Sequence, residues 1–492
     1  MRRAVFLLVC LLFTVARDVR SEEVKPEVPY SVVRVNVTQQ PWDFARPWGK
    51  RPPYSRRAIG TVLSENRVLV TAELVANANY VELEAPDGGL KVPATVEVVD
   101  YEANLALLKA EDPAFLKPFK ALELTHAFIG DTLSVWQLES TGILLVTKGQ
   151  MTTAEVTRYP IDDSPLLVYR MTTPLQFRDS SFTLPVVKDG KLAGLIMRYD
   201  NTTNNAEILP AQVIEHFLQD AKKAPYEGFA RVGIYSSPTR DPQFRRYLGL
   251  DGNIVGGIYV SDVQSDSPAA KGGLEKGDVL LQVDGQAVDQ DGNYKDPEYG
   301  KLALAHLFST RHYDGDVVKC IVFRKGEKKE LSVTLKHRPV ESYVIEPYVI
   351  DRAPKFYVLG GLVLEELSRQ YLKEYGAEWQ KKAPEQFVYF DRQQNELFKD
   401  GPKKIVFLNR ILPSDITVGY EELNQLIVKK VNGMDIQSLA DIPAALNRAT
   451  NGLHKIEFDG EPRIIYLDAA QVSANEAAFQ QKYRLPALQR LD

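Results

Sequence analysis

Short runs of apolar and polar residues, separated by turn residues, make up most of the chain between Val32 and Ala211. Examples are RVLVTA, VPATVEVV, DTLSVWQL and KLAGLIM, each of a length suited to one strand. Short strands at such spacing are typical of an all-β sandwich or a pair of barrels. The following run, AQVIEHFLQDAKK, places its apolar residues on one helical face, so it predicts a helix that closes this part of the chain.

A different strand pattern occurs twice in the second half of the chain. GDVLLQVDG alternates as a strand and ends on the turn dipeptide Asp284-Gly285. ELNQLIVKKVNGMDI is a weaker copy with the turn Asn432-Gly433. The repeat predicts two related β domains after the first.

Three segments of the first half resemble, in order, the triad-bearing segments of the HtrA/Deg family of trypsin-like serine proteases. They are VLVTAELVANA, YEANLALLKAE and LQFRDSSFTLPVVKDGKLAGLIMR, where the family has TNAHVV, DLALLK and GNSGGPL. The resemblance implies a fold of two six-stranded barrels. It places the family histidine on Glu73, the family aspartate on Asn104 and the family serine on Ser181 or its neighbour Ser180.

These replacements remove most of the acyl-transfer chemistry. A serine needs an imidazole to take its proton and a carboxylate to orient that imidazole. Glu73 is a weak base near neutral pH, and Asn104 cannot stabilise an imidazolium. Phe182 and Thr183 replace glycines that would aim backbone N–H groups at the oxyanion. The sequence therefore predicts a pseudoprotease.

The segment FARVGIYSS, followed by SPAAKGGLEKGDVLLQVDG, resembles a PDZ domain in the HtrA/Deg arrangement. A PDZ domain adds an extended peptide to a sheet edge and holds the peptide carboxylate in a turn of backbone N–H groups. The resemblance implies peptide-binding residues in two domains. In the first they are Arg231, Val232, Gly233, Ile234 and Tyr235, with Leu248, Leu250 and Ile258 as pocket or core residues, and in the second Gly360, Gly361 and Leu362.

The expected fold is mainly β: a trypsin-like double β-barrel followed by two PDZ domains, which are β-sandwiches with short helices. The expected limits are 1–21 for a signal peptide, 22–222 for the protease-like domain, 225–338 and 339–470 for the PDZ domains, and 471–492 for a C-terminal tail.

Composition and the N-terminus bear on location and partners. The formal net charge is -5, with basic and acidic residues interspersed, which argues against nucleic acid as a partner. A basic start followed by the apolar run AVFLLVCLLFTVA is the anatomy of a secretory leader, cleaved after Ala16 or Ser21, with an uncleaved anchor as the alternative. We expect an exported protein, periplasmic or secreted, without a membrane span in the mature chain.

Other ligands are not indicated by the residue pattern. The six histidines show no metal spacing, so we expect no metal and no cofactor. Trp42 and Trp48 lie in the aromatic segment PWDFARPWGK, which the resemblance makes a candidate contact in a homotrimer or other homo-oligomer; packing within the chain is the equal alternative.

Two functions follow from these observations. The first is an exported pseudoprotease that binds unfolded or C-terminal peptide segments as a chaperone, adaptor or scaffold in protein quality control. The second is an active serine endopeptidase that uses Ser181 or Ser180 with a non-standard base such as His126.

Overall fold

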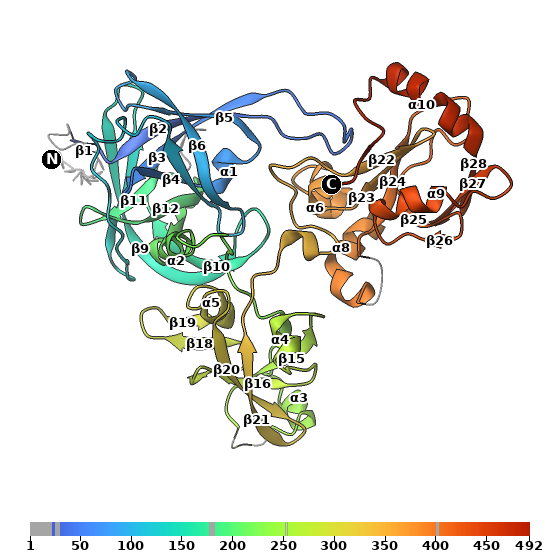
Figure 1. The fold of residues 1–492 in the computed structure, drawn as a ribbon. Helices are drawn as coiled ribbons and strands as arrows, with labels where there is room; N and C mark the ends of the chain where they lie inside the picture. Colours follow the sequence, from blue (N-terminus) through green and yellow to red (C-terminus); the bar gives the residue numbers. More distant parts are fainter. Residues whose placement is uncertain (1–21, 25–29, 177–182, 251, 253, 400–402) are drawn as a thin grey trace, which may run out of the picture.

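Three β-rich parts of the chain lie around a common junction (Figure 1). The structure is a computed structural model that describes residues 22–24, 30–176, 183–250, 252, 254–399 and 403–492. We call the parts the double-barrel domain (22–222), the middle domain (225–338) and the C-terminal domain (339–492). The expected leader, 1–21, lies outside the described residues. Among the described helices, none is long and apolar enough to cross a membrane.

The double-barrel domain contains two six-stranded barrels, as the family resemblance implies. The first closes in the order β2-β3-β4-β7-β6-β5, and the second runs β9-β10-β13-β12-β11-β8 and closes through a β8–β9 pairing. Valines and leucines on the inward faces of the strands fill the first barrel. The elements are β1 (Glu22–Val24), β2 (Val32–Gln39), β3 (Tyr54–Leu63), β4 (Arg67–Val70), α1 (Ala72–Val75), β5 (Ala78–Glu84), β6 (Lys91–Asp100), β7 (Leu105–Ala110), β8 (Thr132–Leu138), β9 (Leu144–Arg158), β10 (Pro165–Thr172), β11 (Pro185–Lys188), β12 (Lys191–Asp200), β13 (Asn205–Pro210) and α2 (Ala211–Asp220).

The middle domain is a sheet in the order β14-β15-β16-β20-β21, and β14 is one of its edges. Helix α5 follows a small hairpin of β18 and β19 and packs toward β10 of the second barrel. The elements are β14 (Ile234–Ser237), α3 (Pro242–Tyr247), β15 (Ile258–Val263), α4 (Pro268–Lys271), β16 (Val279–Val283), β17 (Gln286–Ala287), β18 (Asn293–Asp296), β19 (Gly300–Ala303), α5 (Leu304–Ser309), β20 (Val317–Arg324) and β21 (Glu327–Thr334).

The C-terminal domain repeats this sheet and extends it at one edge, in the order β28-β27-β25-β24-β23-β22-β29. The expected C-terminal tail, 471–492, contains most of helix α10, and its last residues return as β29, which pairs with β22. The elements are η1 (Val340–Ser342), β22 (Phe356–Leu359), β23 (Leu362–Glu366), α6 (Arg369–Lys373), α7 (Trp379–Lys382), α8 (Glu385–Leu397), β24 (Val406–Ile411), β25 (Leu426–Val431), β26 (Met434–Asp435), η2 (Leu439–Asp441), α9 (Ile442–Leu446), β27 (Leu453–Asp459), β28 (Ile464–Asp468), α10 (Ala469–Tyr483) and β29 (Gln489–Arg490).

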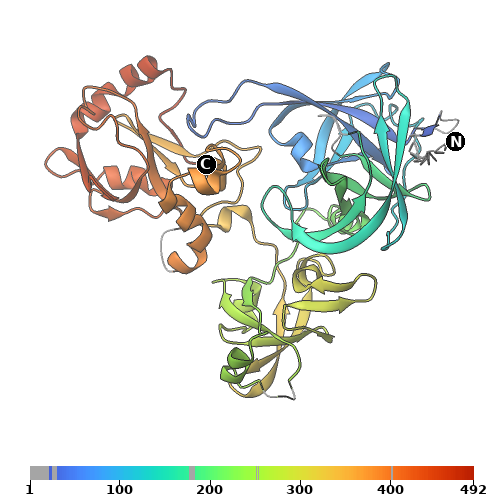
Figure 2. The same cartoon turned by 180° about the vertical axis from the view of Figure 1, so that it is seen from behind.

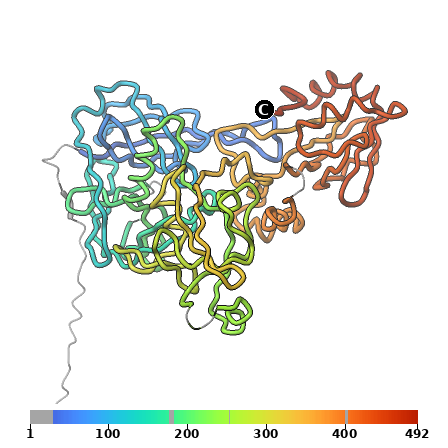
Figure 3. Tube along the Cα trace, turned by 60° about the horizontal axis from the view of Figure 1, so that its bottom comes forward, coloured from blue at the N-terminus to red at the C-terminus, as the bar shows by residue number. Residues whose placement is uncertain are grey.

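A long loop between β2 and β3, which we call the strap (residues 40–53), joins the first barrel to the C-terminal domain (Figures 2 and 3). Phe44 is buried in an apolar cluster of the C-terminal domain that includes Phe407. Trp48 packs edge-on against Phe356, and the Arg490 guanidinium lies over the Trp42 ring. Both tryptophans therefore pack within the chain in this structure.

Two turns of the double-barrel domain bind both other domains through charge. The first turn, residues 100–104, joins β6 to β7, and the second, residues 159–164, joins β9 to β10. The Arg231 guanidinium of the middle domain lies 2.8 Å from Glu102 and 2.9 Å from Asp162, and also donates to Ser164. We call these four residues the Arg231 cluster.

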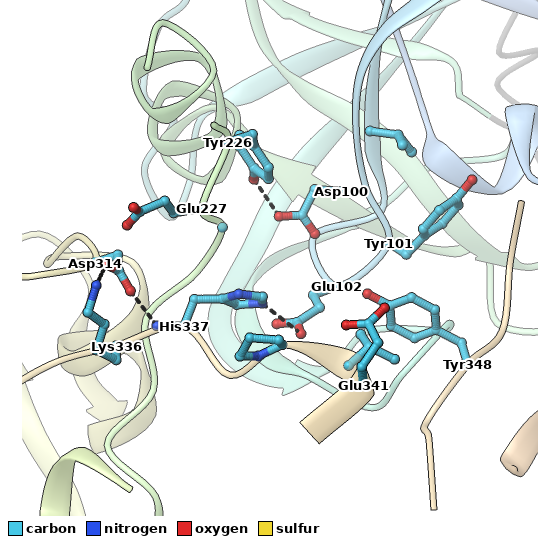
Figure 4. A pocket seen from close by; sticks show the side chains of 14 residues that line it. Asp100, Tyr101, Glu102, Tyr226, Glu227, Asp314, Lys336, His337, Glu341 and Tyr348 are labelled. Atoms are coloured by element: carbon cyan, nitrogen blue, oxygen red, sulfur yellow. Dashed lines mark hydrogen bonds and ion pairs between the residues drawn. The ribbon is translucent and has the colours of Figure 1, made fainter. Parts of the chain in front are cut away.

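Further contacts surround that cluster. His337 Nε2 lies 3.3 Å from Glu102, and Tyr226 donates to Asp100 (Figure 4). From the C-terminal domain, the Lys373 ammonium donates to the Ile161 carbonyl at 2.9 Å. Residues of all three domains line a cavity of about 530 Å³ beside these groups. The relative placement of the domains therefore depends on buried charge as well as on apolar packing.

Truncation of the strap anchor tests its packing. Phe44→Ala should destabilise the C-terminal domain by ~3 kcal/mol, because it leaves a cavity in an apolar core. Hydrogen exchange of β24 should become faster, and the thermal transition of that domain should move down. Tyr54→Ala is the control, since Tyr54 is half exposed at the base of the same loop. Equal effects of the two substitutions would contradict the described docking.

The pH dependence of stability tests the junction. Burial and the Glu102 carboxylate raise the pKa of Asp100 to about 6, above its ordinary value of 3.8. As the pH falls, the folded protein binds a proton at Asp100 near pH 6, whereas the unfolded chain binds that proton only near pH 4. This group therefore favours folding at acidic pH and disfavours it by up to ~3 kcal/mol above pH 6.

Asp100→Asn should remove that dependence, because the amide is neutral at every pH. The variant should melt above the native protein at pH 8 and close to it at pH 5, as followed by calorimetry across the range. Asp189→Asn, in an exposed turn, is the control. Melting temperatures that change with pH in the same way for the native protein and Asp100→Asn would show that folding does not raise the pKa of Asp100.

Candidate functional site

The structure brings together the two first-barrel positions that the family resemblance assigns to the triad. Glu73 lies in α1, and Asn104 lies buried in the turn before β7. The backbone N–H of Glu73 donates to Asn104 Oδ1 at 3.0 Å. Asn104 has a left-handed φ of 53°, which asparagine tolerates better than most residues. The asparagine amide thus fixes the backbone at position 73.

The side chain at position 73 pairs with a cation. Arg56 on β3 lies 3.4 Å from the Glu73 carboxylate, which is 46% exposed. Nothing in this pair supplies the imidazole that a serine nucleophile needs.

Ser180, Ser181 and Phe182 lie outside the described residues, and Thr183 is the first described residue after them. Thr183 has a φ of 61°, in the region that glycine favours and a β-branched residue rarely enters. Its hydroxyl donates to the Ile59 carbonyl of the first barrel. The family resemblance places a glycine at this position, and the backbone of Thr183 has a conformation that glycine favours.

His126 is engaged elsewhere. Its Nε2 lies 2.9 Å from Glu215 on α2, and its Nδ1 lies 3.6 Å from Glu298 of the middle domain. The hydrogen bond to Glu215 raises the pKa of His126. Both ring nitrogens therefore face carboxylates at a domain contact, which is a poor arrangement for a free general base.

The described residues also bear on metal binding. Among them, no group of three or more histidine, cysteine, aspartate and glutamate side chains is arranged to hold a metal ion.

The middle domain carries a groove between β14 and α5. A cavity of about 180 Å³ lies there, and the turn of residues 231–234 forms one end. In the described part of the chain, no backbone carbonyl accepts a hydrogen bond from the N–H of Val232 or Gly233. Gly233 has a φ of 80°, and a Cβ there would lie 2.3 Å from Ser267, so only glycine fits. The backbone of this turn is thus closely packed, and the N–H groups of Val232 and Gly233 have no backbone acceptor among the described residues.

Leu248, Leu250 and Ile258, expected as pocket or core residues, lie in apolar clusters away from the groove. Leu248 and Leu250 pack in a separate cluster with Phe323, and Ile258 lies in the main core, so none of the three lines the cavity. The opposite wall of the groove comes instead from α5, through Ala305, Phe308 and Ser309. The apolar run LALAHLF carried a helical period that could have identified this wall.

Tyr235 lies at the start of β14 and is partly exposed. Its hydroxyl accepts hydrogen bonds from Gln264 and from Asn395 on α8 of the C-terminal domain. The C-terminal domain therefore contacts the strand that borders the groove.

The corresponding edge of the C-terminal domain is already occupied. Gly360 and Gly361 form the two-residue turn of the hairpin β22–β23, and Leu362 is the buried first residue of β23. Strand β22 pairs along β23, whereas β14, at the matching position of the middle domain, has no second partner in the described structure. The expected carboxylate turn at these residues is therefore a hairpin turn.

Comparisons with known proteins agree with this architecture. Residues 230–335 match one family of PDZ domain, and residues 345–490 match a second family of PDZ domain. "Protease Do-like 2, chloroplastic" of Arabidopsis thaliana is 26% identical over 87% of this chain and 70% of its own length. "Protease Do-like 4, mitochondrial" of the same plant is 23% identical over 94% of this chain and 85% of its own length.

A solved structure described as "HtrA-type protease AlgW with decapeptide" is also similar. It is 19% identical, covers 63% of this chain and 96% of its own, and has a TM-score of 0.47. The two barrels, the two PDZ domains and the Do-like relatives together lead to one assignment. The chain belongs to the HtrA/Deg protease family, in an architecture of a trypsin-like double barrel followed by two PDZ domains.

Proposed function

We propose that this chain is an exported, proteolytically inactive member of the HtrA/Deg family that binds peptide segments through its middle domain. The observation that carries this proposal is the Glu73–Arg56 ion pair, which stands where the family has its general base. The neighbouring Asn104 is engaged with backbone and has no imidazole to orient. Loss of the base alone removes most of the rate that a triad provides.

The binding half of the proposal is supported by the groove. β14 is a free edge next to unpaired turn amides, which are the elements needed to add a peptide as a strand. Phe308 and Ala305 offer apolar contact on the facing helix. The C-terminal domain, with its edge filled by β22, serves to support the assembly. The protein would then act as a chaperone, adaptor or scaffold for unfolded or C-terminal segments in the periplasm or outside the cell.

Proteolysis is the direct test of inactivity. Purified mature protein incubated with unfolded casein should yield no fragments by mass spectrometry, because no described group at the triad positions can accept the serine proton. Ser181→Ala and Ser180→Ala should behave as the native protein does. Fragments that disappear in either variant would support the alternative, an endopeptidase with a non-standard catalytic set.

Peptide binding tests the groove. Phe308→Ala should weaken the binding of a short labelled peptide with an apolar end by ~10-fold or more, since it removes a large buried contact. Fluorescence anisotropy measures this change, and circular dichroism checks the fold. Phe308→Leu should retain most of the affinity, and Tyr247→Ala, an exposed site of the same domain, should retain all of it. Equal affinity in Phe308→Ala would place the peptide elsewhere.

A further inference from the structure

One wall of the groove cavity does not belong to the middle domain. Glu102, Ser164, Pro165 and Leu166 of the double-barrel domain line it, together with Tyr343 from the segment that leads to the C-terminal domain. The cavity that begins at the turn amides of the middle domain therefore ends at the barrels. A ligand that filled it would contact both domains.

Glu102 is fixed in that wall. Its side chain is 4% exposed, and its two carboxylate oxygens face Arg231 at 2.8 Å and His337 at 3.3 Å. Burial opposes its charged form, yet Arg231 and His337 hold the pKa of Glu102 below its ordinary value. A fixed negative charge is thus present in the cavity near neutral pH.

Further charged groups lie around Glu102. The buried carboxyl groups of Asp100 and Asp162 lie near it, Arg231 and His337 pair with it, and the Arg369 and Lys373 cations lie near Asp162. Tyr226 and Ser164 add hydroxyl groups without charge. Arg231, which belongs to the turn itself, is already paired with the carboxylates of Glu102 and Asp162.

We infer that Glu102 is a specificity-determining residue of the groove, which makes the docked protein disfavour a free C-terminal carboxylate and accept neutral, internal segments of unfolded chains. The inference rests on the proposed peptide binding by the middle domain. A terminal carboxylate seated on the amides of Val232 and Gly233 would enter the same cavity as the Glu102 carboxylate. Like charges that share a poorly solvated space repel each other strongly. An internal segment carries no such charge.

The test compares two forms of one labelled peptide, identical except that one ends in a free acid and the other in an amide. On the full-length native protein, the amide should bind at least as tightly as the acid. Glu102→Gln keeps the side-chain shape and removes one negative charge from the cavity. In this variant the affinity for the acid, relative to that for the amide, should rise by ~10-fold. Glu111→Gln, an exposed site after β7 in the same domain, should leave the ratio unchanged.

Each outcome decides the question. A native protein that prefers the acid by 10-fold or more would overturn the inference, even if Glu102→Gln failed to fold. An unchanged ratio in a folded Glu102→Gln variant would overturn it as well. Absence of binding by either peptide, in the native protein and in the variants, would overturn the proposed function and the inference with it.

Discussion

The arrangement of this protein depends on one buried ion cluster, in which the Arg231 guanidinium lies between Glu102 and Asp162. Removing either partner would leave an uncompensated charge in a buried site, so the cluster strongly favours one placement of the domains. Arg231 belongs to the turn at the end of the peptide groove, and Glu102 lies two residues before Asn104. The groove and the turn that holds Asn104 are therefore parts of one unit.

The same turn fixes part of the first barrel. Asn104 accepts a hydrogen bond from the backbone N–H of Glu73, so its side chain holds the start of α1 against the turn before β7. The proposed inactivity concerns only which side chains stand at these positions, not the backbone around them. The two PDZ domains differ at the corresponding sheet edge. In the middle domain β14 has no second partner in the described structure, whereas in the C-terminal domain β22 covers that edge. Scaffold and binding edge are thus retained selectively.

Local patterns in the sequence were sufficient to predict the strands and a β sandwich or pair of barrels, because alternation and turn residues act over a few positions. The two six-stranded barrels and the PDZ domains followed from the resemblance to the HtrA/Deg family. That resemblance also singled out Glu73 and Asn104, which the structure brings into contact. The docking of Phe44 into the C-terminal domain, the pairing of β29 with β22 and the groove wall on α5 were missed. Each depends on contacts between distant segments, which no local period encodes.

The measurement that tests this account most directly is hydrogen exchange of the full-length protein, with and without an amidated peptide that has an apolar end, followed by mass spectrometry of the intact protein and peptide. The account predicts slower exchange in residues 231–237 and 304–309, little change in the C-terminal domain, and an intact peptide after long incubation. Cleaved peptide, or protection confined to the double-barrel domain, would contradict it.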